Sequence, residues 1–281
     1  MTLKILNKRK DGYHNIFSII QTVSLFDKIK ISIKLKKNVS ENKLIINCNI
    51  PELKNENNLC YKVAETILKK FKIENYFIKI DIEKNIPIGG GLGGASSDAA
   101  CVALALVKLF KIKITKEKLI KILAKLGKDI PFFLFQGCCI VKSAGEKIKK
   151  IIPPWTQKPL WFVLVYPNVI LSTKKVYETY DKITKNSFYK FDENKILDSI
   201  KKINLKTLLI NDLEKAAFKV FPELKKIKQI MNRFSENVSM SGSGSCFFSV
   251  FKNKKEAEFF KKIVEKKLKN CKIYILKSIT K

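Results

Sequence analysis

Hydrophobic and polar positions follow two periods along this chain, one typical of strands and one typical of helices. Every second residue is apolar from Ile29 to Leu35, and residues 43–50 and 77–82 are similar. Such alternation predicts strands with one buried face. Between them, apolar residues recur at every fourth position from Leu59 to Phe71. That spacing predicts a helix with one buried stripe, and Asn58 is suited to cap its first turn.

Two more helices are predicted before residue 130. Residues 97–110 are apolar nearly all round, as in a helix that is buried on every side. Residues 116–126 are amphipathic and are followed by Gly127, a residue that commonly ends helices.

The pattern is interrupted at Pro153 and Pro154. The elements predicted beyond this break are a strand over 161–166, a helix, an interrupted helical region around Pro222, a strand over 246–251, a helix that starts after Asn253 and a final strand over 273–276. The length of 281 residues suits two domains. We therefore predict an α+β chain with domains over 1–152 and 153–281.

The charge of the chain raises the question of a polyanionic partner. The sequence has 56 basic and 25 acidic side chains, a net charge of +31, which is enough to attract a polyanion. However, only Arg9 and Arg233 are arginines, and the lysines are spread along the whole chain. Base-edge and bidentate phosphate recognition favour arginine. We therefore expect solvated lysine-rich faces and no nucleic-acid partner.

The cysteines and the apolar stretches bear on the cellular compartment. Seven cysteines lie mostly in apolar surroundings, with no CxxC pair and a single histidine in the chain. We therefore expect buried, reduced thiols rather than disulfides or a zinc site. No apolar stretch reaches the roughly 20 residues of a membrane span, and the first residues lack the apolar core of a secretory signal. We expect a cytoplasmic protein without membrane association.

The segment from Pro87 to Ser97 carries the most specific signal. Five of the six positions from Gly89 to Gly94 are glycine, and a helix is predicted to begin just beyond them. Glycines let backbone N–H groups turn inward together, and a helix N-terminus adds unsatisfied donors and partial positive charge. The segment therefore predicts a binding site for nucleotide phosphates.

Other interpretations of this segment are weaker. A P-loop needs a lysine after its last glycine, where this chain has Ala95. The glycines satisfy GxGxxG, but residues 84–88 separate them from the preceding strand and residues 111–126 are mainly helical, unlike a dinucleotide-binding fold. A flexible turn that caps a buried helix is the remaining alternative, and its entropic cost counts against it.

Together with four other segments, this loop resembles a known family. Pro87 to Ala100 is similar to the second motif of the galactokinase, homoserine kinase, mevalonate kinase and phosphomevalonate kinase superfamily, and its paired glycines resemble those of the 4-diphosphocytidyl-2-C-methylerythritol kinases. The other similar segments are KRKDGYH at 8–14, ENNL at 56–59, GKDIPFF at 127–133 and SGSGSC at 241–246. They follow the family's order from residue 3 to about residue 250, and this ordered set is specific where one short motif would not be.

The resemblance implies a fold and a reaction. The fold is a two-domain α+β kinase with a ribosomal-S5-domain-2-like N-terminal domain and a ferredoxin-like C-terminal domain. The reaction is ATP-dependent phosphorylation of the 2-hydroxy position of 4-diphosphocytidyl-2-C-methyl-D-erythritol in the non-mevalonate isoprenoid pathway. Asp129 is the implied general base. Mg²⁺ is expected on the nucleotide, with Ser97 as a weak candidate ligand.

The resemblance also assigns binding residues. The implied ATP-binding residues are Pro87, Ile88, Gly89, Gly90, Gly91, Leu92, Gly93, Gly94, Ala95, Ser96 and Ser97. Tyr13, His14 and Tyr177 are implied around the cytosine ring, where a phenol can stack and an imidazole can pair with the base edge. Gly242, Ser243 and Gly244 are implied near the substrate's phosphates, across the site from the first glycine loop.

Each single residue also has a plainer interpretation. Asp129 suits an ordinary turn, His14 a surface turn, and Tyr177 the core side of an amphipathic helix. The chain also departs from the family, whose members usually begin with a PAKIN-like strand that carries a lysine near the catalytic aspartate. Lys4 does not match that lysine, so we expect either an upstream start or a protein that works without it. Lys128 stands where small residues are usual.

Two other functions compete with this one. One is a superfamily kinase that acts on homoserine or mevalonate, against which the DGYH segment at 11–14 argues. The other is a basic nucleic-acid-binding protein, which would bind with a steep dependence on salt. The expected partner is a small cytidylyl substrate, and the expected assembly is a monomer or weak homodimer.

Overall fold

The computed structural model describes residues 1–35, 42–184 and 191–280. The chain forms two compact units. The larger unit comprises Met1–Ser24, Pro87–Leu92 and Gln136–Lys281, and the smaller unit comprises Leu25–Ile86 and Gly93–Phe135. The chain stays in the larger unit through Pro153 and Pro154, so the compact units do not divide at that break. The predicted domains 1–152 and 153–281 stay a prediction.

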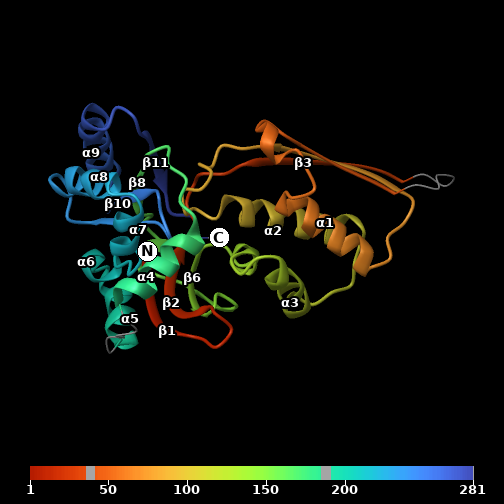
Figure 1. The fold of residues 1–281 in the computed structure, drawn as a ribbon, viewed down its shortest axis with the longest axis horizontal. Helices are drawn as coiled ribbons and strands as arrows, with labels where there is room; N and C mark the ends of the chain where they lie inside the picture. The colour runs from red at the N-terminus through yellow and green to blue at the C-terminus, as the bar shows by residue number, and fades with distance from the viewer. Residues whose placement is uncertain (36–41, 185–190, 281) are drawn as a thin grey trace. The chain divides into compact units, whose positions relative to one another are not determined.

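The larger unit contains two four-stranded sheets, both antiparallel (Figure 1). In the first sheet the order is β1 (Thr2–Lys8), β2 (His14–Gln21), β6 (Cys138–Ser143), β7 (Lys147–Ile151). In the second it is β11 (Lys272–Lys277), β8 (Trp161–Tyr166), β10 (Phe247–Phe251), β9 (Val238–Met240). The helices of this unit are α4 (Thr173–Thr184), α5 (Glu193–Lys202), α6 (Leu205–Leu208), α7 (Glu214–Val220), α8 (Glu223–Asn232) and α9 (Lys254–Lys267), with a 3₁₀ turn over Pro154–Thr156.

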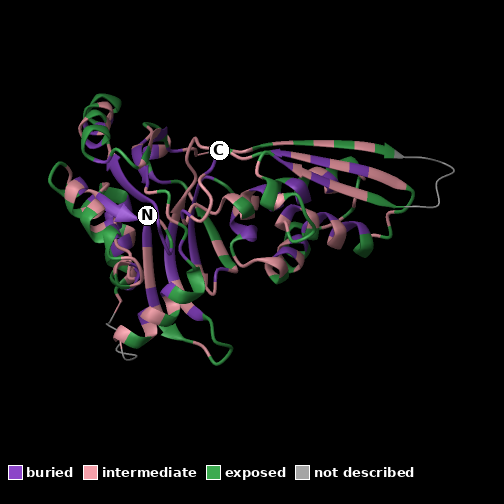
Figure 2. Ribbon diagram, turned by 45° about the horizontal axis from the view of Figure 1, so that its top comes forward, coloured by how far each residue is buried: buried purple, intermediate pink, exposed green. Residues whose placement is uncertain are grey.

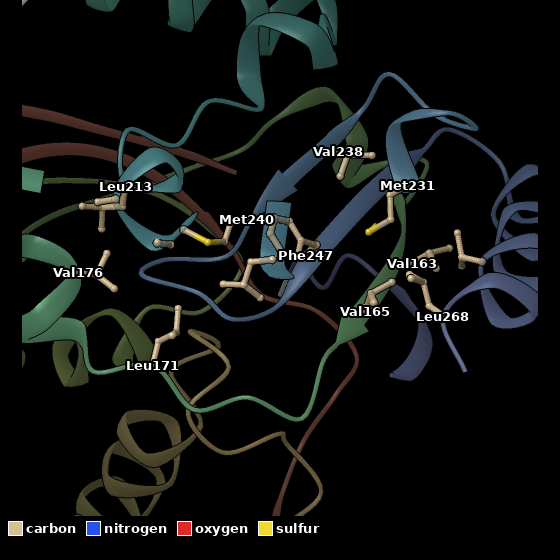
Figure 3. Close-up of a cluster of buried hydrophobic side chains, with 14 of the residues drawn as sticks. Val163, Val165, Leu171, Val176, Leu213, Met231, Val238, Met240, Phe247 and Leu268 are labelled. Atoms are coloured by element: carbon tan, nitrogen blue, oxygen red, sulfur yellow. The ribbon is translucent and has the colours of Figure 1, made fainter. Parts of the chain in front are cut away.

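The core of the larger unit lies between the second sheet and its helices. β8 is apolar at every position, and most of its residues are buried, as expected of a central strand covered on both faces. Val163, Val165 and Phe247 from the sheet pack with Val176 of α4 and Leu213, which precedes α7 (Figure 3). This core fixes the elements that carry the site residues of this unit.

The smaller unit is a three-stranded sheet with helices on one face (Figure 1). Its order is β3 (Lys28–Leu35), β5 (Tyr76–Glu83), β4 (Lys43–Cys48), with β3 antiparallel and β4 parallel to β5. The helices are α1 (Leu59–Lys70), α2 (Gly94–Leu109) and α3 (Lys116–Leu126), with 3₁₀ turns over Pro51–Leu53 and Ile130–Leu134. Exposed and half-buried residues alternate along β3, as its sequence predicts (Figure 2).

Most of the predicted helices and strands are present, and the structure differs from the predictions in three respects. The predicted α2 is amphipathic rather than buried all round, because Leu104 and Leu109 are 42% and 54% exposed. β2, β6, β7 and β9 were not predicted. All seven cysteines are free, as expected, but Cys101 is exposed and Cys271 is half-buried. In the ranges that the structure describes, no helix combines the length and apolar character that a membrane crossing requires.

Candidate active site

The first glycine loop, Pro87–Gly93, connects β5 to α2. Gly89 and Gly91 adopt positive φ angles of +66° and +71°, a region that favours glycine. Within the described residues, the backbone N–H groups of Gly89, Gly90 and Gly91 have no protein acceptor. In the smaller unit, α2 begins at Gly94 without a side-chain cap. Both stretches therefore offer free amides of the kind that bind phosphate oxygens.

The second glycine loop, Ser241–Ser245, lies between β9 and β10 and contacts the first directly. The hydroxyl of Ser241 donates to the carbonyl of Gly91 at 2.9 Å, and the amide of Cys246 donates to Gly90 at 3.1 Å. A Cβ atom on Gly91 would lie 2.2 Å from the carbonyl oxygen of Ser241. The expectation that the second loop lies across the site from the first is therefore wrong for these residues, since no gap separates them.

The second loop rests on the core of the larger unit. A Cβ atom at Gly244, whose φ is +88°, would lie 2.8 Å from Sδ of Met240 and 3.1 Å from Leu171. Figure 3 shows both side chains within the hydrophobic cluster. Only glycine fits here, because a side chain would strain the backbone and displace core atoms.

His14, at the start of β2, is buried and meets α4. Its ring centroid lies 5.1 Å from that of Tyr177, with an angle of 33° between the planes. Its Nε2 lies 2.7 Å from a carboxylate oxygen of Asp181. An ionised carboxylate only accepts hydrogen bonds, so Nε2 carries the proton. Within the described residues Nδ1 has no partner, and in a neutral ring with its proton on Nε2 it is an acceptor.

Asp181 also accepts a hydrogen bond from a lysine. Lys8 Nζ donates to its other carboxylate oxygen at 2.5 Å. Burial tends to raise the pKa of Asp181, but the hydrogen bonds from Lys8 and His14 outweigh it and hold that pKa below its ordinary value. Asp181 is therefore ionised at neutral pH and fixes the imidazole.

Of the other two aromatic residues, Tyr177 is half-buried and also packs against the core of the larger unit. The interpretation of Tyr177 as a core aromatic is therefore confirmed in part, and its role beside a cytosine ring stays a prediction. Tyr13 precedes His14 and is 51% exposed.

One face of α4 connects these features. Thr173, Tyr177 and Asp181 are spaced four residues apart and share that face. The Thr173 hydroxyl lies 2.9 Å from the hydroxyl of Ser243 in the second glycine loop. The next turn, about 6 Å along the axis, carries Tyr177 against His14. A ligand with an aromatic ring and an anionic group one turn apart would fit this face.

Asp129 lies in the smaller unit, immediately before the 3₁₀ turn Ile130–Leu134. Ile130 and Phe132 are buried, and a Cβ atom on Gly93 would lie 2.7 Å from the Phe133 ring. The turn is thus packed against the start of α2. Asp129 is accessible to solvent, but the protein around its carboxyl group reduces its hydration and raises the pKa of Asp129. A carboxylate with a raised pKa is a better proton acceptor.

A buried ion cluster that the sequence did not predict fixes the first turn of α2. Lys84 Nζ donates to Asp98 at 2.7 Å and also to Asp27. The three side chains are at most 6% exposed. Burial raises the pKa of Asp98 to about 6, although Lys84 opposes it. Burial would lower the pKa of Lys84, but the two carboxylates outweigh this and raise it.

Comparison with known proteins identifies the family. The model for the GHMP kinases N-terminal domain matches residues 58–137, and the model for the GHMP kinases C-terminal domain matches residues 192–270. A 4-diphosphocytidyl-2-C-methyl-D-erythritol kinase of Clostridium tetani is 37% identical over 99% of this chain and 96% of its own. The chain belongs to the 4-diphosphocytidyl-2-C-methyl-D-erythritol kinase family.

Further comparisons agree with this family. Its member from a Sulfurihydrogenibium species is 36% identical over 91% of this chain and 90% of its own. A crystal structure of 4-(cytidine 5′-diphospho)-2C-methyl-D-erythritol kinase superimposes with a TM-score of 0.77 and 28% identity, covering 99% of this chain and 95% of the other. The predicted α+β two-domain kinase fold is confirmed, and this member of the family is an ATP-dependent kinase.

Sequence reasoning missed several residues that shape this kinase site. Asp181, Lys84 and Asp27 each act through a partner that is distant in sequence, and no local spacing marks such pairs. Asn211 binds Met240 and Gly242, and Glu214 binds Met240, the residue before the second glycine loop. Both lie in an otherwise ordinary polar segment. Only their contacts reveal them.

The described residues offer little to hold a metal ion by themselves. No group of three or more His, Cys, Asp or Glu side chains in these ranges could bind one. Asp98 is engaged by Lys84. The hydroxyl of Ser97, in the first turn of α2, has no protein partner among these residues. An Mg²⁺ ion that is held mainly by nucleotide phosphates, with Ser97 as one ligand, fits this donor set.

Proposed function

We propose that this kinase transfers the γ-phosphoryl group of ATP to the 2-hydroxy group of 4-diphosphocytidyl-2-C-methyl-D-erythritol, in the non-mevalonate route to isoprenoids. The observation that supports this substrate is the arrangement of side chains on one face of α4. Tyr177 packs on the His14 ring, and one turn away Thr173 contacts Ser243 in the second glycine loop. An aromatic base would lie beside Tyr177 and His14, and a diphosphate would lie beside Thr173 and Ser243.

The cytosine ring of the substrate would lie among Tyr13, His14 and Tyr177. The unprotonated Nδ1 of His14 would accept a hydrogen bond from the exocyclic amino group of cytosine. Uracil presents a carbonyl at that position and would leave two acceptors facing each other. This arrangement therefore favours a cytidylyl over a uridylyl substrate.

The substrate's diphosphate would lie at Gly242, Ser243 and Gly244. ATP would bind along Pro87–Ser97, whose free amides suit its phosphates. Mg²⁺ would be held mainly by the nucleotide phosphates and would offset the charge of the transferred group. Ser97 would contribute a hydroxyl to it.

Asp129 would act as the general base. Its carboxylate takes the proton of the 2-hydroxy group as the oxygen attacks the γ-phosphorus. The bond from that phosphorus to the bridging oxygen breaks, and ADP leaves with the electron pair. The raised pKa of Asp129 supports this role.

The kinase would work in the cytoplasm, where its free thiols stay reduced. It would act as a monomer or weak homodimer.

The test is ADP release in the presence of ATP, Mg²⁺ and one acceptor at a time. We expect turnover with the cytidylyl substrate and less than about one hundredth of that rate with mevalonate or homoserine, which lack a base and a diphosphate. Equal or greater turnover with either of those acceptors would contradict the proposal. No turnover with any acceptor, together with tight nucleic-acid binding that weakens steeply as salt is added, would instead support the nucleic-acid-binding alternative.

A further inference from the structure

Asn211, which lies between α6 and α7, holds the second glycine loop with its side chain. Its Nδ2 donates to the carbonyl oxygens of Met240 and Gly242, each at 2.8 Å. Its Oδ1 accepts from the amide of Leu213 at 2.9 Å. One N–H group of the carboxamide therefore binds the end of β9 and the other binds the loop itself.

The segment that carries Asn211 is itself anchored to neighbouring elements. The amide of Leu3 in β1 donates to Ile210 at 2.7 Å, and the amide of Asp212 donates back to Leu3 at 2.9 Å. Glu214 accepts from the amide of Met240 at 2.9 Å. Met240 is thus held at its carbonyl by Asn211 and at its amide by Glu214, so the loop has little freedom to rotate at its start.

The contact with Gly242 determines where one particular amide points. The carbonyl of Gly242 and the N–H of Ser243 belong to the same peptide unit, and in a trans peptide these two groups point in opposite directions. Because Asn211 binds that carbonyl, the Ser243 N–H points away from Asn211. Ser243 is 9% exposed, and within the described residues this N–H has no acceptor.

A buried N–H group without a protein partner is uncommon and usually has a ligand or a water molecule as acceptor. The hydroxyl of the same residue already contacts Thr173, which is one turn from Tyr177 on α4. Phosphate oxygens are strong acceptors from backbone amides. The geometry points to Asn211 as a positioning residue that aims the Ser243 amide at a phosphate oxygen of the cytidylyl substrate, an inference that rests on the proposed function.

Binding of two probe ligands separates this role from a merely structural one. Cytidine carries the base alone, and cytidine 5′-diphosphate adds the phosphates. We expect the unaltered protein to bind the diphosphate more tightly in isothermal titration calorimetry. Asn211→Asp keeps the shape but removes both donors, so the Gly242 peptide is released. We expect its Kd for the diphosphate to rise about tenfold or more, the effect of a lost charge-assisted hydrogen bond, while its Kd for cytidine stays within about twofold.

Asn168→Asp is the matched control. The Nδ2 of Asn168 donates to the Asn270 carbonyl at 2.8 Å on the surface of the same unit, so this variant loses a similar bond without touching the loop and should bind both ligands as the unaltered protein does. If Asn211→Asp does not fold, Asn211→Ala removes the donors without adding charge and should show the same selective loss.

Failure of the proposed function and failure of the positioning role alone give different binding results. If the unaltered protein binds neither probe, the cytidylyl substrate is contradicted and the proposed function fails with it. If the unaltered protein binds both probes, and the Asn211 variant weakens both by the same factor or neither, the positioning role alone is overturned.

Discussion

At the scale of single residues, Asp181 of α4 holds the His14 ring, with a carboxylate oxygen 2.7 Å from Nε2. His14 and Tyr177 were both predicted as substrate-binding residues from the family resemblance, and the structure brings their rings together. Asp181 was not predicted, because it lies 167 positions from His14 and looks like any other aspartate in an amphipathic helix. Long-range hydrogen bonds of this kind leave no local signal.

Asp181→Asn tests the orientation of His14. We expect KM for the cytidylyl substrate to rise about tenfold, because a charge-assisted hydrogen bond at Nε2 becomes a neutral one that no longer fixes the tautomer. kcat should change less, since Asp181 does not touch the reacting atoms. Because the pKa of Asp181 is lowered in the folded protein, the interaction is intact above the ordinary aspartate range and is lost only as pH falls through the lowered pKa.

Asp198→Asn is a suitable control, since Asp198 pairs with Lys201 at 3.4 Å on an exposed surface. Its KM should match that of the unaltered enzyme. A KM for Asp181→Asn within twofold of the unaltered value would show that Asp181 does not orient His14.

At the scale of elements, the capped amphipathic helices and the strands β8, β10 and β11 could be predicted, whereas β2, β6, β7 and β9 of the larger unit could not. The Asn58 side chain accepts from Cys60 N and Asn253 accepts from Glu256 N, both at 2.9 Å, as their sequence positions predict. β2 and β6 are buried at successive positions, so they lack the alternation that reveals a half-buried strand. For α2, an apolar composition did not show that Ala99, Ala100 and Ala103 face inward and Leu104 outward.

The buried ion cluster of Lys84, Asp27 and Asp98 makes a testable contribution to the stability of the smaller unit. Lys84→Met leaves Asp27 and Asp98 buried together without a cation, and removing one partner of a buried ion pair typically costs about 3–5 kcal/mol. We expect a loss of that size in the free energy of unfolding at pH 8. Without the cation the pKa of Asp98, already raised to about 6, rises further. The variant is therefore more stable at low pH, where Asp98 is protonated, and loses stability as pH rises through that pKa.

Lys79→Met provides the comparison, because Lys79 pairs with Asp81 on the exposed part of β5, with side chains 40% and 34% exposed. It should cost less than about 1 kcal/mol. Urea unfolding at pH 5.5 and 8 measures both variants. Equal destabilisation of the Lys84 variant at the two pH values would show that the carboxylates are not coupled through this lysine.

At the scale of the whole molecule, the ordered motifs predicted the fold and the candidate site residues, but not how the glycine loops are joined. Ser241 and Gly91 are 150 positions apart and hydrogen-bonded. Family order could place them in one site, yet the expected gap between the loops is filled by backbone contacts. The compact units likewise cross the predicted boundary near residue 152, because the N-terminal strands bind residues beyond it: Leu3 of β1 exchanges backbone hydrogen bonds with Ile210 and Asp212, and His14 of β2 contacts Tyr177.

The measurement that tests the account most directly is steady-state turnover of Asp129→Asn with ATP and the cytidylyl substrate. The amide keeps the size of the side chain but cannot take the proton from the acceptor hydroxyl. We predict that kcat falls by about 10²–10⁴-fold, while binding of ATP and of cytidine 5′-diphosphate is unchanged. A kcat close to that of the unaltered enzyme, with the variant folded and saturated by both substrates, would contradict the account.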